Sequence, residues 1–224
     1  MYFGYFHRKP VQCGPGTFLI PLTRGVVSIV DECDVDTVAK HTWCAWQSKT
    51  GQSFYCQARI NGRVEYMHRL IMQHDGYIDH ANGCGVDNRR SNLRIATNSQ
   101  NNHNKVVVVG ECRFKGVRRD KKAFVARIMV NGVDIRLGNH KTEGWAAKVY
   151  DVFCELLVGE FSVCNHSMGL VEKTSESERE RIIRDGVAQL QKRQPEVFGV
   201  FPQLRAALAT FGDFARCNFA EVPA

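Results

Sequence analysis

Two Asn-Gly dipeptides constrain the fold of this chain more than any other feature of its sequence. Asn61-Gly62 separates "SFYCQARI" from "RVEYMHRLIM", and Asn131-Gly132 separates "AFVARIMV" from "VDIRLG". Both central positions of a type I′ turn require positive φ, which asparagine and glycine adopt more readily than other residues. Each dipeptide therefore predicts a β-hairpin, and the fold must contain at least two antiparallel strand pairs.

The second hairpin has one apolar face and one polar face, because its side chains alternate in character along both strands. The apolar set is Phe124, Ala126, Ile128, Val130, Val133, Ile135 and Leu137, and the opposite set is Val125, Arg127, Met129, Asp134 and Arg136. Residues 142–161 then place apolar side chains at helical spacing, at Ala146, Ala147, Tyr150, Phe153, Cys154 and Leu157. We expect a three-stranded antiparallel sheet whose apolar face is covered by this helix.

Shorter elements lie on both sides of these hairpins. "GVVSIVDECD" predicts a strand that ends in a turn, and "DVDTVAKHTW" predicts a short helix. Residues 166–224 predict a helical tail, in which Ser175 and Glu178 have capping-box spacing. We expect the tail to pack against a core, with a DNA clamp and a dimer arm as alternatives. The fold class is therefore α+β.

The stretch "DHANGCGVDNRRSNLRIATNSQNN" is dense in amides and charges and holds few apolar residues. It reads as the end of a strand, a loop, the strand "LRIA", and a helix that begins at a Thr/Asn/Ser cluster. This order can bring Asp79 and His80, at the end of the first strand, close to Asn92 and Asn101. A long solvated loop is the alternative, but a convergent polar site explains the composition better.

These four side chains are suited to hydrolysis of a phosphodiester. Neutral His80 can take a proton from water, because imidazole titrates near working pH. Asn92 can accept a hydrogen bond from the other ring nitrogen and so orient the ring. Asp79 and the amide oxygen of Asn101 are hard oxygen ligands for Mg²⁺. His103 falls two residues after Asn101, so we expect it on the far side of the helix, in contact with solvent or phosphate.

The motifs "MHRLI", "DH", "DNRRSNLR" and "QNN" occur in this order within residues 17–105, and together they resemble the HNH endonucleases of phages and introns. The resemblance places the family's histidine at His80, its central asparagine at Asn92 and its third position at Asn101, which makes this chain a His-Asn-Asn variant. It implies a ββα-metal finger with one Mg²⁺ or Mn²⁺ ion per active site, and double-stranded DNA as the substrate.

The formal charge of +7 is concentrated in the middle of the chain. Residues 113–127, "RFKGVRRDKKAFVAR", hold seven basic residues and one acidic residue. Such a patch attracts polyanions, of which nucleic acid is the usual example in a cell, although a solvated basic face is the alternative.

Residues 113–165 resemble the ethylene-response-factor (APETALA-two-type) DNA-binding domain. The matching residues are "KGVR", an aromatic at Phe124, "LG", "AA" followed by "YD", and Asn165. His140 and Gly144 depart from the pattern. The resemblance implies DNA contacts from Lys115, Arg118, Arg127 and Arg136, with the arginines reading guanine in the major groove. Further DNA-binding candidates are Arg119, in the same basic segment, and Arg89 and Arg90, in the polar stretch.

The nine cysteines are an odd number and include no C-x-x-C pair, so we expect reduced thiols and consider a structural zinc site unlikely. "MYFGYFHRKP" has no apolar core of the kind found in signal peptides. We therefore expect a cytoplasmic protein with no membrane partner, and the resemblance to phage endonucleases implies that it is phage-encoded and acts in the host cell.

The expected organisation has four parts. Residues 1–58 form a strand and helix module that leads into the nuclease, 59–105 the nuclease finger, 113–165 the DNA-binding domain, and 166–224 the helical tail. The expected function is a site-specific, metal-dependent homing endonuclease, which could act as a homodimer. A DNA-binding regulator with an inactive finger and a restriction-type nuclease are the alternatives.

Overall fold

The computed structural model describes residues 9–48, 53–106 and 111–217, with side chains up to residue 211. The chain is mixed α and β, and it divides into two compact units, Met1–Asn104 and Lys105–Ala224. Each unit has its own hydrophobic core. None of the helices in the described part of the chain is both long enough and apolar enough to cross a membrane.

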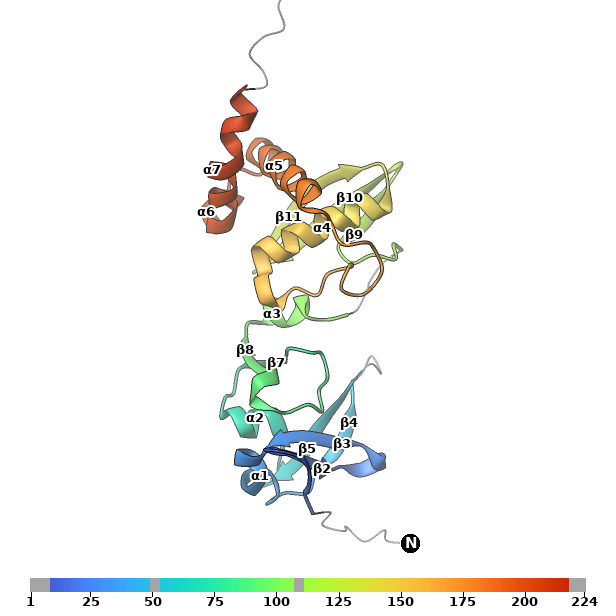
Figure 1. Cartoon of the computed structure of the whole chain (residues 1–224), viewed down its shortest axis with the longest axis vertical. Coiled ribbons are helices and arrows are strands. Elements are labelled where there is room, and N and C mark those ends of the chain that lie inside the picture. The colour runs from blue at the N-terminus through green and yellow to red at the C-terminus, as the bar shows by residue number, and fades with distance from the viewer. Residues whose placement is uncertain (1–8, 49–52, 107–110, 218–224) are drawn as a thin grey trace, which may run out of the picture. The chain divides into compact units, whose positions relative to one another are not determined.

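The first unit consists of three small antiparallel sheets and three short helices (Figure 1). The first sheet has the order β1-β2-β3, and the second has the order β4-β5-β6. The strands of these sheets are β1 (Val11–Gly14), β2 (Thr17–Pro21), β3 (Val27–Asp31), β4 (Cys44–Gln47), β5 (Phe54–Ile60) and β6 (Arg63–Tyr66). Between the sheets lie η1 (Thr23–Gly25) and α1 (Glu32–Val38), and α2 (Met67–Met72) follows β6.

The third sheet of this unit carries the residues of the polar stretch. It pairs β7 (Tyr77–His80) antiparallel with β8 (Leu93–Ala96), and α3 (Asn98–His103) follows. The loop between the strands includes η2 (Arg90–Asn92). Thr97 caps α3 through a capping box with Gln100, as the Thr/Asn/Ser cluster predicted.

The core of the first unit contains residues from both of the modules expected there. Val30 and Trp43 lie in residues 1–58, and Met67 and Ile71 lie in residues 59–105, yet all four belong to one cluster. The nuclease motifs are therefore supported by the preceding strands.

The second unit begins with a three-stranded antiparallel sheet in the order β11-β10-β9. Its strands are β9 (Val117–Asp120), β10 (Ala123–Val130) and β11 (Val133–His140), and α4 (Glu143–Val158) packs on the sheet (Figure 1). The apolar stripe predicted for this helix is buried in full. Gly144 does not interrupt α4, because it lies in the first turn, where a glycine costs less than in the interior.

The two Asn-Gly dipeptides of the predicted hairpins form the expected turns, with left-handed φ at Asn61 (49°), Gly62 (79°), Asn131 (51°) and Gly132 (81°). β5 pairs with β6 and β10 pairs with β11 on either side of them.

The helical tail is part of the second unit's core, as expected. It comprises α5 (Glu176–Arg193), α6 (Val197–Val200) and α7 (Pro202–Cys217), and the short helix η3 (Gly159–Phe161) lies between α4 and the tail. Ser175 and Glu178 form the predicted capping box at the start of α5. Ile183, Val187 and Leu190 are buried in the cluster that also contains the residues of α4.

Candidate active site

His80 lies at the C-terminal end of β7 and is almost fully buried. The β7–β8 pairing places it opposite Leu93 and places Asp79 opposite Arg94. Side chains of successive strand residues point to opposite faces, so Asp79 and His80 have different surroundings despite being adjacent.

Asn88 orients the imidazole of His80. Its Oδ1 lies 3.2 Å from His80 Nε2, and its Nδ2 donates to Ser28 Oγ at 2.8 Å. The Ser28 hydroxyl donates its own hydrogen to the Val86 carbonyl oxygen at 2.9 Å, so it must accept from Asn88. This assigns Oδ1 as the acceptor and places the proton of neutral His80 on Nε2. Nδ1 then carries the lone pair, and no residue within the described ranges hydrogen-bonds to it.

Two aromatic rings enclose His80 and help to keep it neutral. The rings of His68 and Tyr55 lie 5.1 Å and 5.9 Å from the His80 ring, centroid to centroid, both in edge contact. Burial lowers the pKa of His80, and this outweighs the opposite effects of the Asn88 hydrogen bond and of Asp79. Burial, with smaller contributions from His80 and Arg69, lowers the pKa of His68 to about 3. His80 is therefore in the state that can accept a proton.

Asp79 is also buried, and both of its oxygens have partners. Oδ2 accepts from Arg94 Nε at 2.9 Å, and Oδ1 accepts from Asn104 Nδ2 at 2.9 Å. Asn104 Nδ2 also donates to the His80 carbonyl oxygen at 2.8 Å, so this one amide links α3 to both residues. The role of Asn104 was missed, because it lies outside the motifs that the sequence analysis used.

Asn92 holds the loop and does not contact His80, which corrects the hydrogen bond expected between them. Its Oδ1 accepts from the backbone N–H of Asn82 at 3.0 Å, and its Nδ2 donates to the Asp87 carbonyl oxygen at 2.8 Å. Asn88 has the orienting contact instead. Both asparagines belong to the same short motif, so spacing alone could not distinguish them.

Asn101 lies on α3, three residues before Asn104. Residues at this spacing share a helix face, and Asn104 contacts Asp79. Among the contacts of the described residues, none joins the Asn101 side chain to Asp79. The donor chemistry nevertheless fits a hard cation, because a carboxylate offers about four lone-pair sites and an amide oxygen offers two.

His103 is buried, so the expectation that it faces solvent or phosphate is wrong. The helix α3 packs on β7 and β8, and the side chain of His103 is buried by this packing.

Arg89 and Arg90 form ion pairs within the first unit. Arg89 donates to both oxygens of Asp87, from Nε at 2.8 Å and from Nη2 at 2.7 Å. Arg90 donates to both oxygens of Asp34, from Nε at 2.9 Å and from Nη2 at 2.7 Å. Bidentate pairs of this kind fix a loop in place, so both arginines have a structural role that the sequence did not predict.

The sheet of the second unit presents an arginine face, which we define as Arg118, Arg127 and Arg136. Arg127 on β10 lies directly opposite Arg136 on β11, and Arg118 on β9 lies opposite Val125 on β10. Arg127 pairs with Asp134, and Arg136 Nη2 lies 3.1 Å from Asp120 Oδ2. The apolar alternation predicted for this hairpin is confirmed on the other face, where Ala126, Ile128, Val130, Ile135 and Leu137 are buried.

Lys115 does not belong to this face, and the DNA contact expected of it stays a prediction. Its ammonium donates to the carbonyl oxygens of Lys105 and Val163, at 3.0 Å and 2.9 Å. Burial lowers its pKa. Arg119, by contrast, is exposed on β9, opposite Phe124.

Comparison with known proteins gives one informative relative. The chain is 32% identical over 151 residues to an uncharacterized HNH endonuclease of Acanthamoeba polyphaga mimivirus, and the match covers 63% of this chain and 76% of the relative. No protein-family profile matches the chain. No solved structure matches it either.

Proposed function

Because this chain belongs to the HNH endonuclease family, we propose that it is a metal-dependent homing endonuclease that hydrolyses double-stranded DNA. The products are a 5′-phosphate and a 3′-hydroxyl. We further propose that it is phage-encoded and acts in the cytoplasm of the host cell.

The arrangement of His80 and Asn88 is the observation that carries this proposal. A general base needs a neutral imidazole with one nitrogen available and the other held. His80 has its Nε2 held by Asn88 at 3.2 Å, while burial lowers its pKa. Nδ1 is therefore the atom that we assign as the proton acceptor.

The proposed reaction follows from this assignment. A water molecule attacks phosphorus, and its proton passes to His80 Nδ1. The bond between phosphorus and the 3′ oxygen breaks, and this oxygen takes a proton from solvent. Asp79 and Asn101 would hold Mg²⁺ or Mn²⁺, which supplies positive charge against the phosphate. Asn92 keeps the loop between β7 and β8 folded through its contacts with Asn82 and Asp87.

DNA binding is assigned to the second unit. Two guanidinium groups of the arginine face, those of Arg127 and Arg136, are 38% and 47% exposed and already contact carboxylates. Phosphate oxygens or the guanine edge can replace those carboxylates, because both present the same paired acceptors to arginine. Arg119 is exposed but lies opposite Phe124, so it points to the other side of the sheet from Arg118 and is a separate DNA-binding candidate. Arg89 and Arg90 are weaker DNA-binding candidates, since their guanidinium groups hold Asp87 and Asp34.

Arg94 favours a second candidate function, a DNA-binding regulator with an inactive finger. Its guanidinium pairs with the Asp79 carboxylate through Nε at 2.9 Å and Nη2 at 2.8 Å. A carboxylate held by an arginine is a poorer cation ligand than an open one. The two functions differ in whether the protein turns over DNA at all.

Cleavage of supercoiled plasmid and of candidate target DNA separates the two functions. We expect nicked or linear products with Mg²⁺ or Mn²⁺, none with a chelator, and 5′ ends that ligate without prior phosphorylation. One finger cuts one strand, so we propose that a double-strand break requires a homodimer or two successive events. Binding without any cleavage under both metals would support the regulator.

A further inference from the structure

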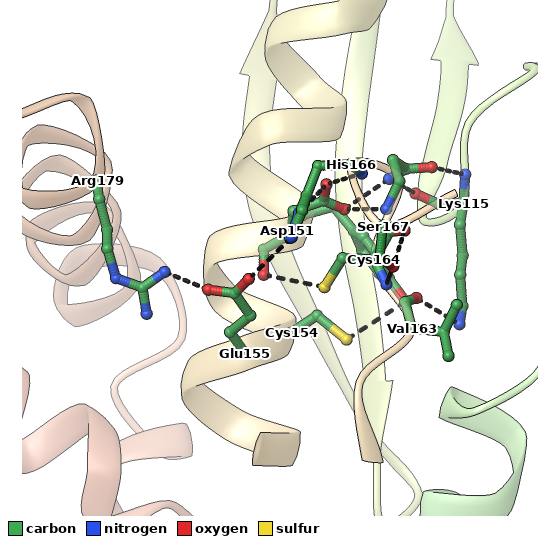
Figure 2. Close-up of polar contacts among 11 residues, drawn as sticks. Lys115, Asp151, Cys154, Glu155, Val163, Cys164, His166, Ser167 and Arg179 are labelled. Carbon is green, nitrogen blue, oxygen red and sulfur yellow. Dashed lines mark hydrogen bonds and ion pairs between the residues drawn. The ribbon is translucent and has the colours of Figure 1, made fainter. Parts of the chain in front are cut away.

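Glu155, Cys164 and His166 form a cluster of possible metal ligands in the second unit, outside the surfaces assigned to DNA. One donor atom from each residue lies within 4.8 Å of the other two. Glu155 belongs to α4, while Cys164 and His166 follow η3 (Figure 2). The three supply oxygen, sulfur and nitrogen, which is a donor set that zinc accepts.

Asp151 orients His166 in the way that a carboxylate orients a metal-ligating histidine. Its Oδ2 accepts from the His166 backbone N–H at 2.9 Å and lies 3.3 Å from His166 Nδ1. Its Oδ1 accepts from the backbone and the side chain of Asn165, at 2.8 Å in both cases. Metal-ligating histidines almost always donate their other ring N–H to such a partner. This contact directs His166 Nε2 toward Glu155.

Arg179 holds the Glu155 carboxylate by one oxygen and leaves the other available. The arginine, on α5, pairs with Oε2, whereas Oε1 lies 3.6 Å from His166 Nε2 (Figure 2). With Nδ1 donating to Asp151, Nε2 presents a lone pair to a carboxylate oxygen. In this tautomer, His166 Nε2 and Glu155 Oε1 can both offer lone pairs to one cation placed between them.

The surroundings of the cluster provide an entry path and a sulfur ligand. A cavity of roughly 260 Å³ opens beside His166 and Glu155, and Thr174, Lys173 and Glu176 are among its other lining residues. Cys164 is buried, and its Sγ lies 3.7 Å from the Asp151 carbonyl oxygen. Ligands of a tetrahedral zinc ion lie about 3.3 to 3.8 Å apart. The donor atoms of the cluster, which lie within 4.8 Å of one another, would have to move closer by about 1 Å to bind such an ion.

We propose that Glu155, Cys164 and His166 bind one zinc ion, or a divalent ion of similar softness, with water as the fourth ligand on the cavity side. Asp151 and Arg179 hold the ligands in place. The ion would join α4 to the segment after η3, and through Arg179 to α5, so it would stabilise the second unit. This site is independent of the proposed nuclease chemistry.

Binding requires the loss of one proton. As the zinc–sulfur bond forms, the thiol proton passes to the buffer, and no electrons are transferred. Affinity should therefore rise with pH.

The sequence signal for this site is Cys-x-His, which is weak without the preceding helix. The lack of C-x-x-C pairs argues against a zinc site built mainly from cysteines. It does not argue against a site that uses one cysteine, one histidine and Glu155. Only the fold brings residues 155 and 166 together.

Metal analysis of the full chain tests the proposal. Chelator-treated protein is reduced with a phosphine, supplied with excess Mg²⁺, and titrated with Zn²⁺ and separately with Co²⁺. We expect the native chain to bind one more equivalent of zinc than Cys164→Ser or His166→Gln. We also expect a thiolate-to-cobalt charge-transfer band in the native chain that Cys164→Ser lacks. Glu155→Gln should weaken binding at least tenfold.

Two controls make the outcome decisive. Cys112→Ser removes another buried thiol of the same core and should bind zinc as the native chain does. Thermal unfolding without metal shows whether each variant folds, and Glu155→Gln provides a second variant if Cys164→Ser does not. Equal zinc binding by the native chain and all three site variants would overturn the proposal. So would the absence of the charge-transfer band in the native chain.

Discussion

Asn88 holds the ring on which the proposed chemistry depends, and at the residue scale it gives the first prediction. Asn88→Ala removes the only hydrogen bond to His80 Nε2 among the described residues, so the ring can rotate or change tautomer. We expect single-turnover cleavage to slow by about 10- to 100-fold, as when an orienting partner of a functional histidine is lost. DNA affinity should stay within twofold of native.

The control for this prediction is Asn102→Ala, which changes an exposed amide on α3 and should leave the rate unchanged. A native rate in Asn88→Ala would show that Asn88 does not orient the base.

His68 gives a prediction about stability and pH. In the unfolded chain this histidine binds a proton near its ordinary pKa of 6.5, but in the folded chain it does so only near a pKa of about 3. The unfolded state binds more protons between these values, so the free energy of unfolding should fall as pH falls through that window. The slope from one such group is at most about 1.4 kcal/mol per pH unit.

Denaturant unfolding of the native chain and of His68→Phe from pH 7 to pH 4 measures this effect. Phenylalanine keeps the ring and removes the titration, so the variant's curve should be shallower. Parallel curves would mean that His68 is not buried as a neutral ring.

At the scale of single elements, the close packing of α5 against α4 gives a prediction about stability. A Cβ placed on Gly186 would lie 2.5 Å from Phe153 Cζ, whereas a Cβ on Gly144 would meet nothing within 4 Å. We expect Gly186→Ala to lower the free energy of unfolding by about 1 to 3 kcal/mol through overpacking. Gly144→Ala should raise it by up to about 1 kcal/mol, because alanine is the better helix former.

Chemical denaturation of both variants measures whether the free energy of unfolding falls in Gly186→Ala and rises in Gly144→Ala. A stabilised Gly186→Ala would show that α5 does not pack closely on α4.

The elements also differ in how far the sequence could predict them. The two hairpins, the stripe on α4 and both capping boxes depend on neighbouring residues, so local patterns were sufficient. The choice of Asn88 over Asn92 depends on Ser28, which is sixty residues away from Asn88 in the sequence. The inward position of Lys115 likewise depends on Val163. Contacts that join distant segments decide such details, and a single sequence does not contain them in readable form.

The arginine face gives a prediction about binding. Each arginine that contacts a phosphate should contribute about one to the slope of log affinity against log salt. Arg118→Ala and Arg127→Ala should therefore each lower that slope by about one. Lys115→Ala should lower stability without changing the slope, because its ammonium binds backbone carbonyls.

Fluorescence anisotropy at several salt concentrations measures these slopes. An unchanged slope in all of the arginine variants would show that these arginines do not contact DNA phosphates.

At the scale of the whole molecule, the chain has two units with separate cores, and the proposed function assigns DNA cleavage to the first and DNA binding to the second. The first unit holds His80, Asn88 and Asp79, and the second holds the arginine face. Substitutions at the site in the first unit should therefore change the cleavage rate without changing DNA affinity. Substitutions in the arginine face of the second unit should change DNA affinity without changing the cleavage rate of bound DNA. Cleavage rates of the variants should therefore be compared when the same fraction of protein has DNA bound, so that a change in rate is not a change in affinity.

The most direct test of the account is single-turnover cleavage by His80→Ala at saturating DNA and Mg²⁺. A general base contributes about 10²- to 10⁴-fold to such a rate. We predict a loss of at least a hundredfold with unchanged DNA affinity, while His74→Ala, a histidine outside the site, cuts at the native rate. Cleavage by His80→Ala at the native rate would contradict the assignment of His80 as the base.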